Sequence, residues 1–214
     1  MGTAPAVGGC QWPDPDLRER GREYLAPAAA EWNASAPVTR TDELGLDAAG
    51  SMLDRNRLLV LRGLVSPSRH YDLRAAAIQG SARRVSATES QRDSWVQYDI
   101  EPHSLVWNSL MATPATELVP AALKRPIGQV ECWSNLYAAG ERIGWHKDRD
   151  GGVQLVLCLE RALEGGILVV RISGRQIACD LLPGDAVLFY ATELPHATTR
   201  IIRGRRITAV MRFY

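Results

Sequence analysis

The sequence predicts a mainly β protein with helices flanking its N-terminal half, and three observations support this prediction. From residue 129 to residue 214, short apolar runs rich in β-branched and aromatic residues alternate with turn residues. These runs lack a helical period, and their spacing is typical of an all-β sandwich or barrel. Helix-start signals, by contrast, gather before residue 129.

One domain is expected, because 214 residues with 46% hydrophobic side chains suffice for a single substantial core. Residues 1–16 are rich in Gly, Pro and Ala and predict an irregular arm, whereas 17–128 predict helical support and a lid. In chain order we expect a helix broken near Pro27 over 16–36, a short helix over 44–54, a strand over 57–62 and a helix from Ser66 to Ile78.

Residues 129–214 form the expected β core. Strands are expected over 129–137, 143–146, 153–159, 167–172, 176–182, 186–190, 196–202 and 206–214. Turn signals that contain glycine separate several of them, at 138–140, 163–166, 173–174 and 183–185.

A polar stretch over 81–99 predicts a solvated loop. The alternative is an active-site cover, because long loops in compact domains often serve that purpose. Trp95 and Tyr98 lie in this stretch. Such aromatic residues are more often part of a core, but here they are also candidates for contact with a substrate.

Charge and cysteine content limit the classes of function. The formal net charge is +1, so no global field favours nucleic acid, although a local basic patch could still bind it. No apolar run approaches membrane-spanning length, and the N-terminus lacks signal-peptide features. The four cysteines form no C-x-x-C pair, which argues against a zinc site or a disulfide framework. We therefore expect a soluble cytoplasmic protein.

The candidate site is formed by His146, Asp148 and His196. Two imidazoles and one carboxylate on one face of a metal leave the opposite positions open, as in the facial triad of non-haem Fe(II) oxygenases. An isolated H-x-D pair is weaker evidence, because it more often contains an ordinary hydrogen-bonded histidine.

Strand alternation adds candidates for a second site. Because successive side chains point to opposite faces, Asn135 and Tyr137 should share one face, and so should Arg206, Thr208 and Arg212. A buried arginine requires an anion, and the hydroxyl of Thr208 can donate to the same anion. The alternative interpretation of each arginine is a solvated charge on an edge strand.

Residues 129–214 resemble the Fe(II)/2-oxoglutarate-dependent dioxygenases. The matching elements are His146-Lys-Asp148, Gly165-Gly166, Pro183-Gly-Asp185 with Phe189, His196 and Gly204-Arg-Arg206. The offset 206 − 196 = 10 is similar to that of prolyl hydroxylases. The resemblance implies a double-stranded β-helix core of the jelly-roll, cupin-like type, with iron bound by the triad and 2-oxoglutarate bound by Arg206.

The segment 135–150 also resembles the AlkB pattern N-x-Y-x-x-G-x-x-I-x-x-H-x-D-x-D within that family. This resemblance implies that Asn135, Tyr137 and Arg212 join Arg206 in binding 2-oxoglutarate. It also places Asp150 where AlkB enzymes contact a substrate base. Arg149 and Asp150 are the best candidates for contact with a polar substrate.

The family chemistry consumes O2 and 2-oxoglutarate, releases succinate and CO2, and oxidises a substrate C–H bond, commonly with ascorbate as support. Halogenases of the family lack the carboxylate ligand, so Asp148 favours hydroxylation or a variant such as desaturation, epoxidation or N-demethylation. We expect a hydroxylase of a small molecule, such as an amino acid or a natural-product intermediate. The alternatives are an AlkB-type demethylase of alkylated bases and a non-catalytic, cupin-like metal-binding protein.

Overall fold

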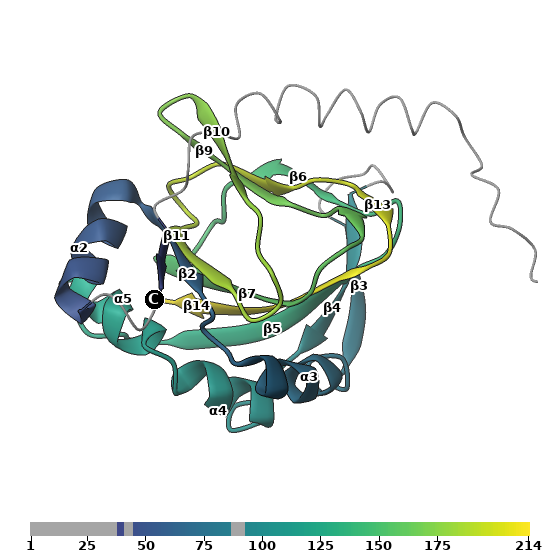
Figure 1. Ribbon diagram of the computed structural model, residues 1–214, viewed down its shortest axis with the longest axis horizontal. Coiled ribbons are helices and arrows are strands. Elements are labelled where there is room, and N and C mark those ends of the chain that lie inside the picture. Colours follow the sequence, from purple (N-terminus) through teal and green to yellow (C-terminus); the bar gives the residue numbers. More distant parts are fainter. Residues whose placement is uncertain (1–37, 41–44, 87–92) are drawn as a thin grey trace, which may run out of the picture.

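The computed structural model describes residues 38–40, 45–86 and 93–214. Within these residues the strands form an eight-stranded sheet, a four-stranded sheet and a two-stranded pair. Figure 1 shows the two larger sheets facing one another, with the helices outside the eight-stranded sheet. The prediction of a mainly β fold with a jelly-roll core is confirmed. No helix in the described ranges is long and apolar enough to span a membrane.

The larger sheet forms one wall of the jelly roll. Its order is β1 (Val38–Arg40), β2 (Leu58–Arg62), β11 (Ala186–Tyr190), β7 (Val153–Glu160), β14 (Arg206–Phe213), β5 (Val130–Tyr137), β4 (Ser94–Asp99) and β3 (Ala82–Ser86). Neighbouring strands are antiparallel, apart from the parallel pair of β1 and β2. The wall therefore combines strands from both halves of the chain.

The smaller sheet forms the opposite wall. Its order is β10 (Arg175–Cys179), β9 (Leu168–Ile172), β12 (His196–Thr198) and β6 (Ile143–His146), and beside it β13 (Ile201–Arg203) pairs with β8 (Glu164–Gly165). In the antiparallel pair of β12 and β6, His196 lies directly opposite His146. Pairing of the strands thus brings together two residues that are far apart in the sequence.

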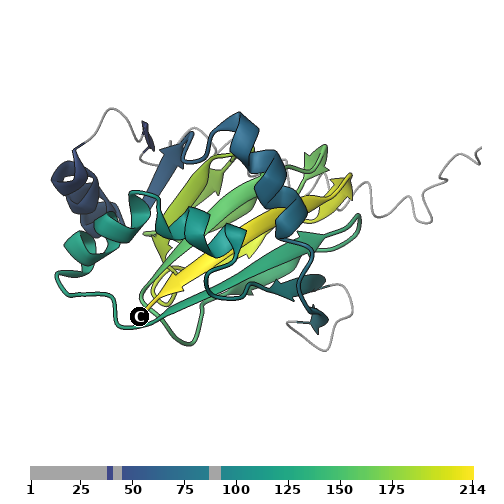
Figure 2. The same ribbon diagram turned by 90° about the horizontal axis from the view of Figure 1, so that it is seen from below.

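The described residues contain four helices, α2 (Leu46–Asn56), α3 (Pro67–Ala76), α4 (Leu105–Met111) and α5 (Ala115–Leu123). Figure 2 shows them across the outer face of the larger sheet. On β14, Ile207, Met211 and Phe213 face the helix-covered core, while Val210 faces the core between the sheets. The alternation expected for β14 is confirmed, and it directs Arg206, Thr208 and Arg212 toward the interior of the jelly roll.

Two sequence predictions about the elements were wrong. The polar stretch expected to be a loop contains β3 and β4, which pair with each other and extend the larger sheet. The single strand expected over 196–202 is divided into β12 and β13, because its two ends pair with strands of different sheets. The arm over 1–16 and the helix over 16–36 lie outside the described residues.

A candidate metal centre and its cavity

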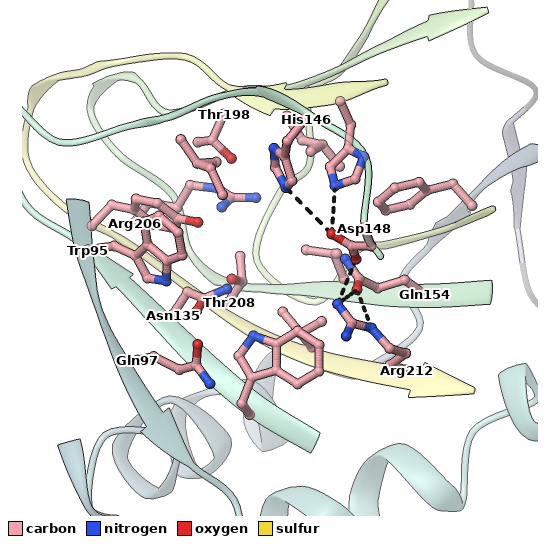
Figure 3. A pocket seen from close by; sticks show the side chains of 18 of the residues that line it. Trp95, Gln97, Asn135, His146, Asp148, Gln154, Thr198, Arg206, Thr208 and Arg212 are labelled. Carbon is pink, nitrogen blue, oxygen red and sulfur yellow. Dashed lines mark hydrogen bonds and ion pairs between the residues drawn. The ribbon is translucent and has the colours of Figure 1, made fainter. Parts of the chain in front are cut away.

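The two histidines and Asp148 form a compact cluster between the sheets. The rings of His146 and His196 have centroids 4.2 Å apart, and Asp148 lies two residues beyond the end of β6. Oδ1 of Asp148 lies 3.6 Å from Nε2 of His146 and 3.7 Å from Nε2 of His196. One ligand atom from each residue lies within 4.8 Å of the others, which is close enough to surround one metal ion (Figure 3).

Backbone carbonyls orient both imidazoles. Nδ1 of His146 donates to the carbonyl oxygen of Gly144 at 2.8 Å, and Nδ1 of His196 donates to that of Leu194 at 2.9 Å. A carbonyl can only accept, so each ring carries its proton on Nδ1 and leaves the lone pair of Nε2 free. Metal-binding histidines in proteins are usually held in this way.

Burial keeps His196 in the neutral form that metal binding requires. Its side chain is almost completely enclosed. The ring of Phe189 packs edge-on against the imidazole, with the two ring centroids 4.9 Å apart. Burial, followed by the nearby His146, lowers the pKa of His196 to about 4. Both effects disfavour a second positive charge in the cluster.

Arg212 binds the outer oxygen of Asp148. Its Nη2 lies 2.7 Å from Oδ2 of Asp148 and 3.3 Å from Oε1 of Gln154. The guanidinium also lies 4.8 Å from the centre of the Trp133 ring and 3.8 Å from Glu131. The ion pair leaves Oδ1 of Asp148 directed at the histidines. Arg212 therefore lies at the metal end of the site, where its guanidinium already has partners.

The cluster opens into a cavity of about 460 Å³. Ten of the twelve predicted site residues line it, namely Trp95, Asn135, Tyr137, His146, Asp148, Arg149, His196, Arg206, Thr208 and Arg212. Tyr98 and Asp150, which were predicted to contact a substrate, do not line it. On β4 the cavity residues are Trp95 and Gln97, so Tyr98 points to the other face of the sheet, and Asp150 is exposed beyond the cavity.

Arg206 defines the other end of the cavity. It is only 5% exposed, and no hydrogen bond or ion pair joins its guanidinium to the residues that the structure describes. The guanidinium carbon lies 5.6 Å from the centre of the Tyr137 ring, and the Trp95 ring stacks on Tyr137 at 6.0 Å. Burial raises the pKa of Tyr137, so its phenol remains protonated at neutral pH.

Further polar atoms near Arg206 lack partners. Within the described residues, Oγ1 of Thr208, Oδ1 of Asn135 and Nε1 of Trp95 are buried and form no hydrogen bond. Buried polar groups are normally paired, so several unpaired ones in a single cavity indicate a binding site. Figure 3 shows these side chains grouped near Arg206, apart from Arg212. A buried cation with hydrogen-bonding groups around it suits a carboxylate.

Sequence reasoning missed several lining residues, including Gln97, Trp133, Gln154 and Thr198. A signal existed for two of them. Trp133 has the same strand parity as Asn135 and Tyr137, so alternation alone places it on the cavity face. Gln154 is a polar residue in an otherwise apolar run, Val153 to Leu159, which is itself a reason to suspect a specific partner.

The fold matches solved structures of iron- and 2-oxoglutarate-dependent oxygenases. An oxidoreductase of the 2OG-Fe(II) oxygenase family from Burkholderia pseudomallei has 18% identity and a TM-score of 0.67, with 84% of this chain and 95% of that chain covered. A prolyl-4-hydroxylase from Pseudomonas putida has 20% identity and a TM-score of 0.66, with 78% and 97% covered.

A third similar structure is that of an epimerase rather than a hydroxylase. The non-haem α-ketoglutarate-dependent epimerase SnoN from nogalamycin biosynthesis has 12% identity and a TM-score of 0.63, with 79% of this chain and 82% of that chain covered. Comparisons with protein-family models and with curated protein sequences give no match. The chain thus has the jelly-roll fold of these solved structures, and it carries a His-x-Asp…His cluster of its own between the sheets.

Proposed function

We propose that this protein is an Fe(II)- and 2-oxoglutarate-dependent oxygenase that hydroxylates a C–H bond of a small molecule. The supporting observation is that one cavity contains both the His146, Asp148 and His196 cluster and the unpaired, buried Arg206. A protein that only binds a metal does not need the second feature. An oxygenase needs both, because its cosubstrate must bind close to its iron.

The metal is proposed to bind to His146, His196 and Asp148. Two neutral nitrogens and one carboxylate oxygen suit Fe(II) and leave coordination positions free. With 2-oxoglutarate and O2, bound iron would supply the oxidising chemistry, releasing succinate and CO2, and ascorbate would support turnover. The protein would orient the ligands, exclude bulk water and hold the substrate C–H bond near the metal.

The cosubstrate is proposed to bind between the metal and Arg206. Arg206 would form an ion pair with the carboxylate farther from the metal, and the hydroxyls of Thr208 and Tyr137 would donate to it. The amide of Asn135 would complete the pocket. The fit is supported by the buried polar atoms of Thr208 and Asn135, which lack partners in the described residues.

Hydroxylation of a small molecule is favoured over the alternatives. The cavity volume of about 460 Å³ lies in the range for small-molecule sites. The AlkB-type function is the second candidate, supported by the match over 135–150. The exposed position of Asp150 weakens that alternative, because the residue expected to contact a base does not line the cavity that contains the metal cluster.

The direct test is a screen for succinate formation. Purified protein is supplied with Fe(II), 2-oxoglutarate, ascorbate and O2, and free amino acids, peptides and methylated nucleosides are added in turn. We expect succinate above the level of the His146→Ala variant, and mass spectrometry should find one added oxygen atom in the stimulating compound. If the wild type forms no more succinate than that variant under any condition, the proposed function is wrong.

A further inference from the structure

We propose that the substrate of this site carries an acidic group, a carboxylate or a phosphate, which Lys147 and Arg149 bind beside the metal. This inference rests on the proposed function and adds the chemical class of the substrate. It starts from two cations that the structure leaves without partners at the cavity.

Lys147 and Arg149 both line the cavity, and both are exposed. Neither forms a hydrogen bond or an ion pair with any residue in the described part of the chain. They alternate in sequence with the ligands His146 and Asp148, so Lys147 is one peptide unit from each ligand. Both cations line the same cavity as the three proposed ligands, so an anion that they bind there would lie beside the metal.

Nearby acidic side chains already have partners. Asp148 is paired with Arg212 at 2.7 Å, and Asp93 is paired with Arg142 at 2.5 Å. The buried Glu141 is paired with Arg84 and also accepts from the backbone amide of Ala138. Asp150 is close in sequence, but it does not line the cavity and forms no ion pair with Lys147 or Arg149. The two cations are therefore available to a ligand.

The charge balance of the cavity supports an anionic substrate. The ionised side chains that line it are Asp148, Lys147, Arg149, Arg206 and Arg212. Four positive charges and one negative charge give 4 − 1 = +3, with the two histidines counted as neutral metal ligands. Fe(II) and doubly charged 2-oxoglutarate cancel each other, so the loaded cavity keeps an excess of positive charge. This excess remains even after Glu131, which lies 3.8 Å from Arg212 outside the lining, is included.

A small molecule fits this arrangement better than a nucleic acid does. Proteins that follow a nucleic acid backbone neutralise several phosphates along a surface. Here two unpaired cations flank a cavity of about 460 Å³, which is the scale of a small-molecule site. The positive field would also increase the rate at which acids enter the cavity.

The first experiment compares matched compounds in the succinate assay. Each free amino acid is tested beside its amide, and phosphorylated sugars are tested beside the free sugars. We expect the acidic member of one series to have a kcat/KM about tenfold higher than its neutral partner, since two exposed ion pairs can contribute up to about fivefold each. The series that responds distinguishes a carboxylate from a phosphate.

The variants assign this preference to the two cations. The double variant Lys147→Gln/Arg149→Gln should lower kcat/KM for the acid about tenfold and that for the amide by a much smaller factor, so that the preference for the acid is lost. The matched control is Arg175→Gln, which removes an exposed charge on β10 outside the cavity and should retain the preference. Raising the ionic strength should reduce the advantage of the acid in the wild type. A double variant that keeps the full preference would overturn the inference.

A binding measurement separates this inference from the proposed function. Trp95 and Trp133 line the cavity, so the same compound pairs can be titrated by intrinsic fluorescence with 2-oxoglutarate present. Acid-selective binding that requires Lys147 and Arg149, without succinate formation, would support the inference and reject the oxygenase. Succinate formation with equal use of acids and amides would support the oxygenase and reject the inference of an acidic substrate. If only oligonucleotides stimulate turnover, the small-molecule proposal is wrong.

Discussion

The two ends of the cavity differ in how completely their polar groups are paired. At the metal end, each histidine donates from Nδ1 to a carbonyl, and the outer oxygen of Asp148 accepts from Arg212. At the other end, Arg206 is buried without an ion pair, and Oγ1 of Thr208 has no hydrogen-bond partner in the described residues. The groups that orient the metal ligands are already paired, whereas Arg206 and Thr208 need a ligand to supply a partner.

This difference indicates how each ligand would contribute to stability. A buried charge or hydroxyl without a partner destabilises the folded chain, because it has lost water and gained nothing in exchange. An anion at Arg206 would remove that penalty. The metal end instead supplies ligand atoms that are already oriented, so metal binding should require little rearrangement. The predictions below test this comparison, starting with the largest expected effect.

The largest effect is expected from loss of a metal ligand. Asp148→Ala should reduce succinate formation to background, because it removes the only anionic ligand of the proposed metal site and changes the coordination that hydroxylation needs. It also leaves Arg212 without its closest anion. Calorimetry should find metal binding weakened, and circular dichroism should find the β fold retained. Normal turnover in this variant would show that Asp148 is not a metal ligand.

The next effect concerns Arg206. Arg206→Met should raise the KM for 2-oxoglutarate by about 100-fold, because truncating one partner of a buried charge pair costs about 2–5 kcal/mol. Metal affinity should be unchanged. The ligand-free variant should unfold at the same temperature as the wild type or higher, since an unpaired buried charge has been removed.

Saturation kinetics and thermal unfolding measure these two quantities. Excess 2-oxoglutarate should stabilise the wild type, by about 2.7 kcal/mol at 100 times Kd, and should leave the variant unchanged. If the KM does not change, Arg206 is not the partner of the cosubstrate.

The fold was predictable where one strand face is buried. The alternation of β14 determined which residues enter the interior, because one face packs on helices and the other lines the site. The strands β3 and β4 were missed because their sequence is polar: Arg83 and Arg84 are exposed on β3, at the edge of the sheet. The division of 196–202 depends on pairing with two different sheets, which no local pattern contains.

The site was predictable where chemistry requires particular residue types at a fixed spacing. His146, Asp148, His196 and Arg206 could be selected for that reason, and all four line the cavity. The contact of Arg212 with Gln154 was not predictable. It joins residues 58 positions apart and depends on the register in which β14 pairs with β7.

A smaller effect is expected from Arg212, which positions Asp148 at the metal end. Arg212→Gln should weaken metal binding about 10–100-fold, the usual effect of removing a group that holds a metal ligand. Gln154→Leu is the matched variant, since it removes a support of Arg212 while keeping the ion pair, and its effect should be smaller. Competition with a metal-binding dye measures both. Equal metal affinity in Arg212→Gln and the wild type would mean that Asp148 does not need this partner.

The smallest effect is expected from Trp95, whose Nε1 is buried without a partner near Arg206. If this N–H donates to 2-oxoglutarate, Trp95→Phe should raise the KM for the cosubstrate about fivefold, the contribution of one hydrogen bond. Stability without ligand should not fall, because the unpaired group is removed and the stacking on Tyr137 is kept. A rise in the KM for the substrate alone would instead support the contact with substrate that the sequence predicted. Trp95→Phe thus decides whether this side chain belongs to the cosubstrate end of the cavity or to the substrate.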